Sequence, residues 1–374
     1  MRTSSRIALF SALLAACANC TGAPSARPSA AAPPTEQPRP APAVAPATPA
    51  VTEAPSAEPP REVELTGPIE QPPIADYELG ALPDGFGEVV WPAAPRIVRQ
   101  VELQGGERVI DRAGTRVVVS GPTARIVVRA DDVEIRGSSS APVDHVLIER
   151  GRRRVRIAGG RFGSIELHVP AQHVPPPPTW RSEWMVEDVT IDGVEIEAAD
   201  TAFLVRGRRI AILRSQVSAA RYSVWCGDTD DLQTEELVLA GNRFTSAGPE
   251  STVRLVSVRR AIVIDNVLSN TLKHDFRVHG ESDDVVFARN QLLNTGIMVG
   301  SMEGDRIGSV WILDNALHHR APSLIEVPRE RVRRLIARGN RVFSDEWDCF
   351  VCGRPRAGWQ VANNQVAPYR PPSP

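Results

Sequence analysis

The chain has 374 residues, a formal net charge of -2 and an isoelectric point near 6.4, so it carries no overall basic field. This argues against a nucleic-acid-binding protein, whose affinity depends on many phosphate contacts. Aromatic residues make up only 5% of the chain, and valine, isoleucine and arginine are abundant beyond residue 73, a composition that favours many short strands and excludes a mainly helical bundle.

The N-terminus has the pattern of an export signal. Arg2 and Arg6 precede an apolar run that is too short to span a bilayer as a helix. The small residues before Cys17 resemble the bacterial lipobox, and this resemblance implies cleavage before Cys17 and lipidation of that residue. Ala18 resembles the following residue of lipoproteins sent to an outer membrane. We therefore predict a signal peptide at residues 1–16 and a lipid-anchored protein of the outer membrane or cell surface; the alternative is a plain secretory signal.

The segment after the signal, residues 17–76, is rich in proline and alanine and is predicted to form an extended, disordered tether. We expect three parts to follow it, namely an N-terminal cap segment at 77–110, a folded repeat at 111–368 and a disordered tail at 369–374.

Three cysteines fall in the folded part, an odd number for an oxidising compartment. Cys349 and Cys352 could form a disulfide if the chain turns between them, which leaves Cys226 over. One such pair with no second ligand pair does not indicate a zinc site.

A local pattern recurs beyond residue 130: two apolar residues, five and three positions before a corner residue, and a third apolar residue two positions after it. Asparagine is the usual corner residue, and we expected it to adopt left-handed backbone angles and to hydrogen-bond locally. A fixed period of this size indicates a solenoid. The corner residues lie 21 to 27 positions apart, with one gap of 34, at Ser138, Gly160, Val194, Ser215, Asn242, Asn266, Asn290, Asn315, Asn340 and Asn364.

The alternation of apolar and polar residues on both sides of each corner predicts two short strands joined by a tight bend. The pattern resembles the right-handed parallel β-helix of the pectate-lyase-like superfamily, which implies an all-β solenoid of about ten coils with an asparagine ladder. The gap of 34 residues indicates a loop projecting from one coil, at residues 168–184.

Paired charges precede the corners by seven and six positions and alternate in sign from coil to coil. Because neighbouring coils should lie about 4.8 Å apart, each pair should face an opposite charge, so we interpret the series as structural. The series is weakened at Gly308-Ser309 and resumes at Arg333-Arg334. Its first seven members are Asp131-Asp132, Arg153-Arg154, Glu187-Asp188, Arg208-Arg209, Glu235-Glu236, Arg259-Arg260 and Asp283-Asp284.

One strand carries an unusual set of ionisable residues. If Phe276 and Val278 point inward, the alternation of the strand places the residues between and beside them on the outer face. The same reasoning puts Arg254, one coil earlier, beside Arg277, and Glu326 two coils farther on. The set also includes the only lysine of the chain. The predicted site therefore consists of Arg254, Lys273, Asp275, Arg277, His279 and Glu326.

Such a row suits β-elimination from a uronic-acid polysaccharide, which needs a cation for the sugar carboxylate and a base for the adjacent proton. The segment around Arg277 and His279 resembles the Arg-His-Gly segment of β-helix alginate and chondroitin lyases, although Val278 intervenes. The catalytic candidates are Lys273, Arg277 and His279, and the substrate-binding candidates are Arg254, Asp275 and Glu326. A hydrolase would need two carboxylates, for which Asp275 and Glu326 are the obvious choices.

Two functional classes remain open on the sequence. In the first class, the β-helix binds an acidic polysaccharide and could also cleave it. In the second class, it is a non-catalytic scaffold for adhesion, glycan binding or envelope structure. The aromatic residues before the row could form a sugar platform or could cap the core; they are Trp180, Trp184, Tyr222 and Trp225.

The expected partners are an anionic polysaccharide and the membrane, through Cys17, with no nucleic acid, and the chain is expected to be a monomer. No cofactor is required by the pattern. A calcium ion could bind Asp228, Asp230 and Asp231 through carboxylate oxygens, although such clusters are also ordinary turn formers.

Overall fold

The computed structural model describes residues 77–167, 185–227, 234–249, 251–270, 274–294, 296–300, 304–318, 331–345, 350–351 and 356–371, together with the strands at 61–64 and 325–326. These residues belong to one compact unit, Ser56–Pro374. Within them every regular element is a strand, and none is a helix long and apolar enough to cross a membrane.

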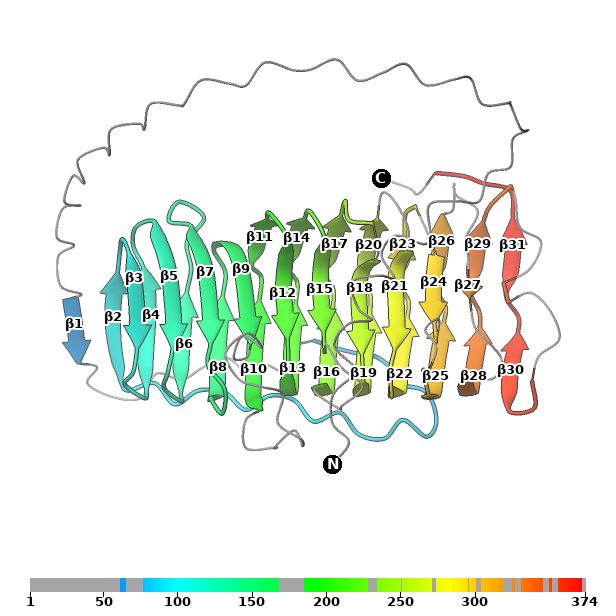
Figure 1. Cartoon of the computed structure of the whole chain (residues 1–374), viewed down its shortest axis with the longest axis horizontal. Helices are drawn as coiled ribbons and strands as arrows, with labels where there is room; N and C mark the ends of the chain where they lie inside the picture. Colours follow the sequence, from blue (N-terminus) through cyan, green and yellow to red (C-terminus); the bar gives the residue numbers. More distant parts are fainter. Residues whose placement is uncertain are drawn as a thin grey trace, which may run out of the picture. The chain divides into compact units, whose positions relative to one another are not determined.

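The strands form two sheets that wind around a shared core (Figure 1). In sheet A, β1 pairs antiparallel with β2, and the other neighbours are parallel. Sheet A has 13 strands, in the order β1 (Arg61–Glu64), β2 (Arg99–Leu103), β4 (Thr115–Val119), β6 (Val133–Arg136), β8 (Arg153–Ala158), β10 (Val186–Asp192), β13 (Gly207–Leu213), β16 (Thr234–Ala240), β19 (Val258–Ile264), β22 (Asp283–Ala288), β25 (Ile307–Leu313), β28 (Val332–Arg338) and β30 (Trp359–Ala362).

Sheet B is parallel and divides into two rows after its first strands. It begins with β3 (Glu107–Ile110), β5 (Thr123–Val128), β7 (Val143–Ile148) and β9 (Arg161–Leu167). The first row continues with β11 (Glu195–Ala198), β14 (Gln216–Ala219), β17 (Arg243–Ser246), β20 (Val267–Asn270), β23 (Gln291–Leu292), β26 (Ala316–His318), β29 (Arg341–Phe343) and β31 (Gln365–Ala367). The second row contains β12 (Thr201–Val205), β15 (Tyr222–Cys226), β18 (Ser251–Val256), β21 (His274–His279), β24 (Gly296–Val299) and β27 (Ile325–Glu326).

The chain is therefore a right-handed parallel β-helix, as predicted. Each regular coil takes one strand from sheet A and then turns at a corner residue into sheet B, and the alternating apolar side chains fill the interior. Leu239, Phe244 and Val253 of one coil, for example, are all fully buried. About eight turns, from β10 to β31, follow this plan. The number differs from the predicted ten because the earlier turns are built differently: each has one strand in each sheet, and their stacking already begins at Arg99.

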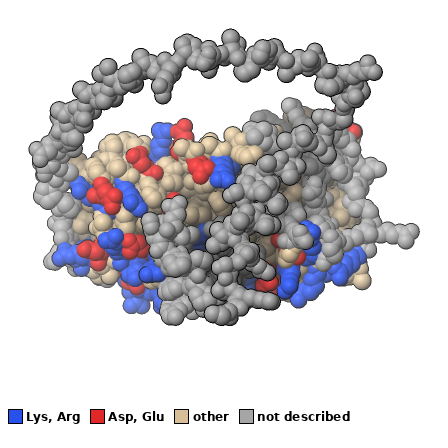
Figure 2. All heavy atoms as spheres, in the orientation of Figure 1, with Lys and Arg blue, Asp and Glu red and all other residues tan. Residues whose placement is uncertain are grey.

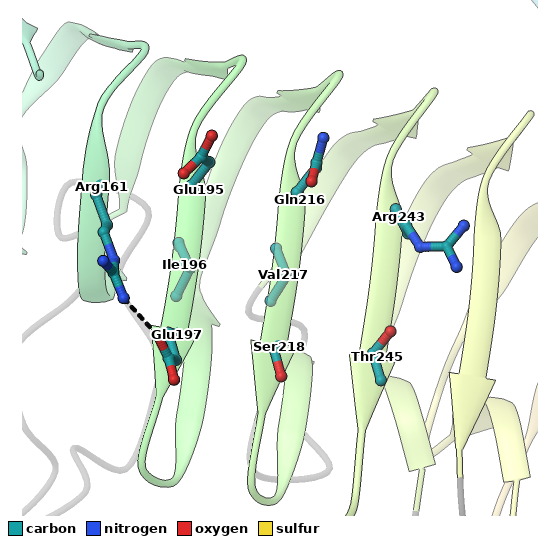
Figure 3. Close-up of a pocket in the computed structure, with 9 residues that line it drawn as sticks. All are labelled: Arg161, Glu195, Ile196, Glu197, Gln216, Val217, Ser218, Arg243 and Thr245. Atoms are coloured by element: carbon teal, nitrogen blue, oxygen red, sulfur yellow. Dashed lines mark hydrogen bonds and ion pairs between the residues drawn. The ribbon is translucent and has the colours of Figure 1, made fainter. Parts of the chain in front are cut away.

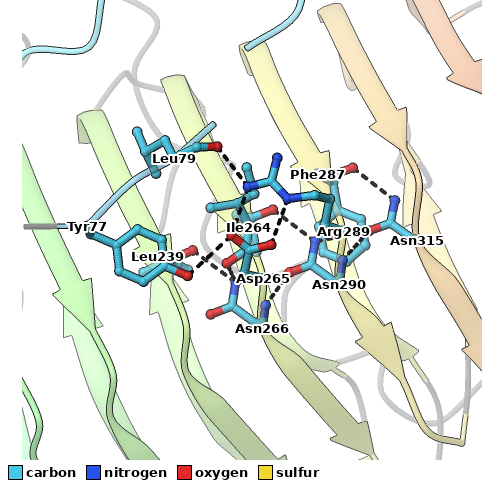
Figure 4. Close-up of polar contacts among 11 residues, drawn as sticks. Tyr77, Leu79, Leu239, Ile264, Asp265, Asn266, Phe287, Arg289, Asn290 and Asn315 are labelled. Carbon is cyan, nitrogen blue, oxygen red and sulfur yellow. Dashed lines mark hydrogen bonds and ion pairs between the residues drawn. The ribbon is translucent and has the colours of Figure 1, made fainter. Parts of the chain in front are cut away.

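The asparagines form the predicted ladder, but not for the predicted conformational reason. The backbone N–H of each donates to Oδ1 of the next, at 2.9 Å for Asn266 to Asn290 and 2.8 Å for Asn290 to Asn315, and each Nδ2 also donates to a main-chain carbonyl (Figure 4). The left-handed angles fall one residue earlier, at positions such as Asp265 and Arg289, with φ of 56° and 52°. The asparagine is selected by its amide, which satisfies buried donors and acceptors.

The alternating charges lie in register on sheet A, as predicted. Glu187 pairs with Arg208 across β10 and β13, and the series continues through neighbouring strands. Arg208 Nη2 lies 2.7 Å from Glu187 Oε1, and Arg154 Nε lies 2.7 Å from Asp132 Oδ1. The hydrogen bond from Arg154 holds the pKa of Asp132 below its ordinary value. Each partly exposed pair contributes about 0–1 kcal/mol, so the main effect of the alternation is to favour the correct register.

Residues 77–98, here called the strap, cross the outer face of sheet A and lead into β2 (Figure 1). Leu79 and Phe86 are buried against an apolar surface formed by β13 to β28, so this part of sheet A is covered on both faces. Buried sheets of this kind have continuous apolar runs, such as residues 261–264. This arrangement is more extensive than the local cap that the sequence predicted.

Polar contacts hold the strap along its length. Tyr77 Oη donates to Asp265 at 3.2 Å, and Arg289 donates to the carbonyl of Leu79 at 2.7 Å (Figure 4). Farther along, the main chain at Ala93 donates to Asp188 at 3.1 Å. Burial and the neighbouring Asp265 carboxylate raise the pKa of Tyr77 to about 12. Asp188 belongs to the series of alternating charges, so this member of the series also helps to hold the strap.

Several sequence-based predictions fall outside the described residues. These are the signal peptide, the lipidated Cys17, the tether apart from residues 61–64, the loop at 168–184 and the suggested bridge between Cys349 and Cys352. Residues 61–64 were predicted to be part of the disordered tether, but they form β1 and pair with β2. Cys226 is described, and it is a buried free thiol whose pKa is raised by burial.

Candidate functional site

The second row of sheet B aligns three half-buried side chains on its outer side: Trp225, Arg254 and Arg277, which we call the arginine row. Trp225 pairs with Arg254 across β15 and β18, and Arg254 pairs with Arg277 across β18 and β21. The prediction that Arg254 lies beside Arg277 is therefore confirmed. Phe276 and Val278 point into the core, also as predicted. Parallel neighbours lie about 4.8 Å apart, so the row presents two guanidinium groups on successive coils.

Aromatic rings position one end of the arginine row. Tyr222 is fully buried, and its ring centroid lies 5.0 Å from that of Trp225. Arg254 donates to Tyr222 Oη at 3.1 Å, and its guanidinium carbon lies 5.5 Å from the Trp225 ring centroid. The guanidinium of Arg221 lies 5.8 Å from the same centroid. Trp225 thus lies beside two arginines. The burial of Tyr222 favours, for that residue, the capped core over the sugar platform, the two alternatives that the sequence left open.

The arginine row departs from the alternation of charge that governs sheet A. Like charges directly opposite each other on neighbouring strands are unfavourable. Arg254 and Arg277 nevertheless occupy paired positions, and the next residue in the column is Met298 of β24 rather than a carboxylate. The row therefore places two guanidinium groups on neighbouring strands, where the series on sheet A would place opposite charges.

Asp275 and His279 share the outer side of β21 with Arg277, but they are not accessible there, and this corrects the prediction of an exposed four-residue row. Their exposed fractions are 0% and 1%. Asp275 is in the column of Ser223 and Thr252, whose hydroxyls bond carbonyl oxygens of the first row at 2.9 and 3.0 Å. This column lies in the corner between the two rows of sheet B, which explains its burial. Alternation along a strand predicts the side of a residue but not its depth.

His279 forms a buried pair with Asp305. Its Nδ1 lies 3.3 Å from Asp305 Oδ2, and Asp305 Oδ1 accepts a hydrogen bond of 2.8 Å from the main chain of Gly280. Burial lowers the pKa of His279, and the positive charges of Arg277 and Arg254 add to this effect, which outweighs the opposing contribution of Asp305. At neutral pH the ring is therefore uncharged, and Nδ1 carries the proton that it donates to the carboxylate.

The remaining candidates are not brought into the site by the described structure. Lys273 lies outside the described residues, as do Asp228, Asp230 and Asp231 of the suggested calcium loop. Glu326 pairs with Met298 in β27, at the predicted position two coils from Arg277, but its side chain is not described. Among the residues that are described, no group of three acidic, histidine or cysteine side chains could hold a metal ion.

A shallow hollow lies on the first row of sheet B, across β9 to β17 (Figure 3). Arg161 and Glu197 form an ion pair of 2.6 Å at one end, and Gln216, Ser218 and Thr245 supply uncharged hydrogen-bonding groups. These side chains are ordinary for the outer face of a solvated sheet, so the hollow does not suggest a specific reaction.

The sequence analysis missed two residues of the site, Arg221 and Asp305. Asp305 lies 26 positions after His279, close to one coil period, so the repeat could have indicated it. Arg221 directly precedes Tyr222, but a surface arginine among so many has no distinguishing signal.

Comparison with known proteins gives no assignment of family. No family model matches the chain, and no curated protein matches it. Two solved structures of PfbA, a surface protein and adhesin of Streptococcus pneumoniae, are similar to it. The first has a TM-score of 0.43 and 12% identity, covering 75% of this chain and 77% of the other. The second has a TM-score of 0.36 and 11% identity, covering 67% and 72%. At this level of similarity nothing about function follows for this chain.

Proposed function

We propose that this protein is an exported, lipid-anchored β-helix whose arginine row binds an acidic polysaccharide. The single observation that supports this most strongly is the pairing of Arg254 with Arg277 on neighbouring coils. Two guanidinium groups in paired positions can bind the carboxylates of one ligand together through charge-assisted hydrogen bonds. The export signal and the lipobox resemblance at Cys17 support a location where such polymers occur.

A polymer is the favoured ligand because the row is extended. The strands of successive coils repeat at about 4.8 Å, so carboxylates spaced along a chain could each meet a guanidinium group. The contacts of Arg254 with Tyr222 and Trp225 hold its side chain in place before a ligand arrives, and this reduces the entropy lost on binding.

We propose binding without cleavage. Elimination from a uronate requires a base that reaches the proton next to the carboxylate, in a site open to the polymer. His279 and Asp275 are buried, so within the described part of the chain neither candidate base or acid is exposed beside the arginines. The pair of His279 with Asp305 is better explained as support for the end of β21.

The test is titration of the full chain with polygalacturonate or alginate by isothermal calorimetry. Arg277→Ala should remove a charge-assisted contact of about 1.5–3 kcal/mol and weaken binding about tenfold to a hundredfold. The matched control is Arg161→Ala, since Arg161 is also an outward-facing arginine of sheet B but lies on the first row. Equal loss in both variants, or no affinity in the parent protein, would disprove the proposal. Release of unsaturated products, followed by absorbance, would show that the protein is a lyase instead.

The location has its own experiment. Replacing Cys17 with alanine should move the protein from the membrane fraction to the soluble exported fraction. Membrane association that is unchanged in this variant would remove the lipid anchor from the proposal while leaving the binding site untouched.

A further inference from the structure

A second group of arginines surrounds a hollow near the C-terminal end of sheet A. Arg306, Arg331, Arg333 and Arg356 line it, and they come from three successive coils, around β25, β28 and β30. In Figure 2 basic side chains predominate over the region where Figure 1 places β28 and β30. This hollow is separate from the arginine row, and no prediction from the sequence included it.

The hollow lies where the series of alternating charges omits one member. The pair expected after Asp283-Asp284 would be basic, but the chain has Gly308 and Ser309 there. A Cβ atom at position 308 would overlap the carboxylate of Asp283, which occupies that space and accepts a hydrogen bond of 2.6 Å from the main chain of Ser309. Asp283 also reaches Arg333, two coils farther on, at 3.2 Å.

The lining carries more positive than negative charge. Among the described residues of the lining, four guanidinium groups meet three carboxylates, those of Glu281, Asp283 and Asp305. Asp305 is only 7% exposed and directs its two oxygens at His279 and at the main chain of Gly280, so it offers little to a ligand. Glu281 lies 3.7 Å from Arg306, and both side chains are largely exposed. Surface pairs of this kind are weak and exchange readily for a better partner.

We propose that this hollow binds a tetrahedral oxyanion, the sulfate or phosphate group of a larger ligand. Guanidinium groups suit such anions because each presents two parallel N–H donors, and several forks can approach one tetrahedral group from different directions. A planar carboxylate is matched by one fork and would not need arginines from three coils. Arg331 Nη1 also donates a hydrogen bond of 3.4 Å to the carbonyl of Gly300. Anion binding in this hollow does not depend on polysaccharide binding at the arginine row.

The experiment uses the full chain and titrates it by isothermal calorimetry with inorganic sulfate and, separately, inorganic phosphate, in chloride buffer of constant ionic strength. Calorimetry is preferred to a melting shift because both anions stabilise folded proteins without binding a site. The parent protein should show saturable binding at one site. The double variant Arg331→Gln, Arg356→Gln should lose at least tenfold in affinity, whereas Arg161→Gln, a matched surface arginine with a carboxylate partner elsewhere, should not.

Circular dichroism and the unfolding midpoint of the double variant check that its fold is intact. Saturable binding of sulfate alone or phosphate alone would support the site and identify its anion. The absence of saturable heat in the parent protein would overturn the proposal, as would equal affinity in the parent and the double variant. Polygalacturonate carries neither sulfate nor phosphate, so its titration tests the arginine row separately.

Discussion

Replacing Phe86 with alanine should show how strongly the strap stabilises the β-helix. Phe86 is 3% exposed and lies with its ring centroid 6.1 Å from that of Trp311, in an edge-to-face arrangement. The guanidinium of Arg260 lies 5.3 Å from the Phe86 ring centroid and also donates to the Phe86 carbonyl. The substitution would remove all ring contacts and leave the main-chain contact in place.

The expected loss is about 3 kcal/mol. Truncating a buried phenylalanine to alanine costs roughly 3–5 kcal/mol, and the low end applies because the strap lies on the surface of the sheet and can relax toward it. Loss of the aromatic pair, about 0.5–1.5 kcal/mol, is included in that figure. The free energy of unfolding would be measured in urea, by circular dichroism and by tryptophan fluorescence in parallel, so that separate release of the strap appears as two transitions.

Val90 provides the matched control, because it belongs to the same strap but is 45% exposed. Val90→Ala should change the free energy of unfolding by less than about 0.5 kcal/mol. If Phe86→Ala is no more destabilising than Val90→Ala, the strap is not an integral part of the folded unit, and the covered face of sheet A needs another explanation.

Three further predictions concern charge and buried polar groups. Arg259→Glu should lower the melting temperature by placing a like charge opposite Glu235, and the effect should shrink at high salt; a salt-independent change would contradict the charge series. Asn290→Ala should cost about 2–4 kcal/mol, because it leaves buried groups without partners, and the same change at the half-buried Asn364 should cost less; equal costs would be evidence against the ladder. Folding lowers the pKa of His279, so as the pH falls through about 6.5 the unfolded state takes up the proton before the folded state does. The free energy of unfolding should therefore decrease from that pH down to the lowered pKa. His279→Gln should make this decrease smaller when unfolding is measured at several pH values, and an unchanged slope would refute the prediction.

The fold could be predicted because two periods agree. A short period of two residues marks each strand, and a long period of about 25 marks each coil, and both are visible around the asparagines from Asn242 to Asn364. The same periods gave the register of Arg254 with Arg277, since pairing in a solenoid follows from counting residues between corners. Local pattern alone was sufficient for these features.

The strap could not be predicted in the same way. Residues 77–98 have no period, and their contacts are with coils far along the sequence, such as Tyr77 with Asp265. The sequence nevertheless contained a signal on the other side of the contact. Apolar residues occupy successive positions in sheet A, as at Ala261-Ile262-Val263-Ile264, and a strand with one face in water would have alternated. A continuous run therefore indicates that a second layer covers the sheet.

The site was predicted in position but not in accessibility. The sequence placed Asp275, Arg277 and His279 on one side of β21, and only Arg277 is partly exposed there. Depth depends on neighbouring coils: Asp275 lies in the corner beside Thr252, and His279 is enclosed with Asp305 from the following turn. Such neighbours are set by the lengths of the connecting segments, which have no pattern. A row of ionisable residues on one strand therefore indicates a side of the sheet and not a catalytic group.

The distribution of charge explains why a net charge of -2 is a poor guide to this protein's ligands. Charges on the surface interact over about 8–10 Å at physiological salt, so a ligand responds to the coils that it touches and not to the whole chain. Over most of sheet A the alternating pairs cancel within that distance. Among the described residues, arginines gather at two other places, the paired Arg254 and Arg277 on sheet B and the hollow around Gly308. An anionic ligand should therefore discriminate these two places from the remainder of the surface, although the composition as a whole excludes a protein that binds polyanions through a general basic field.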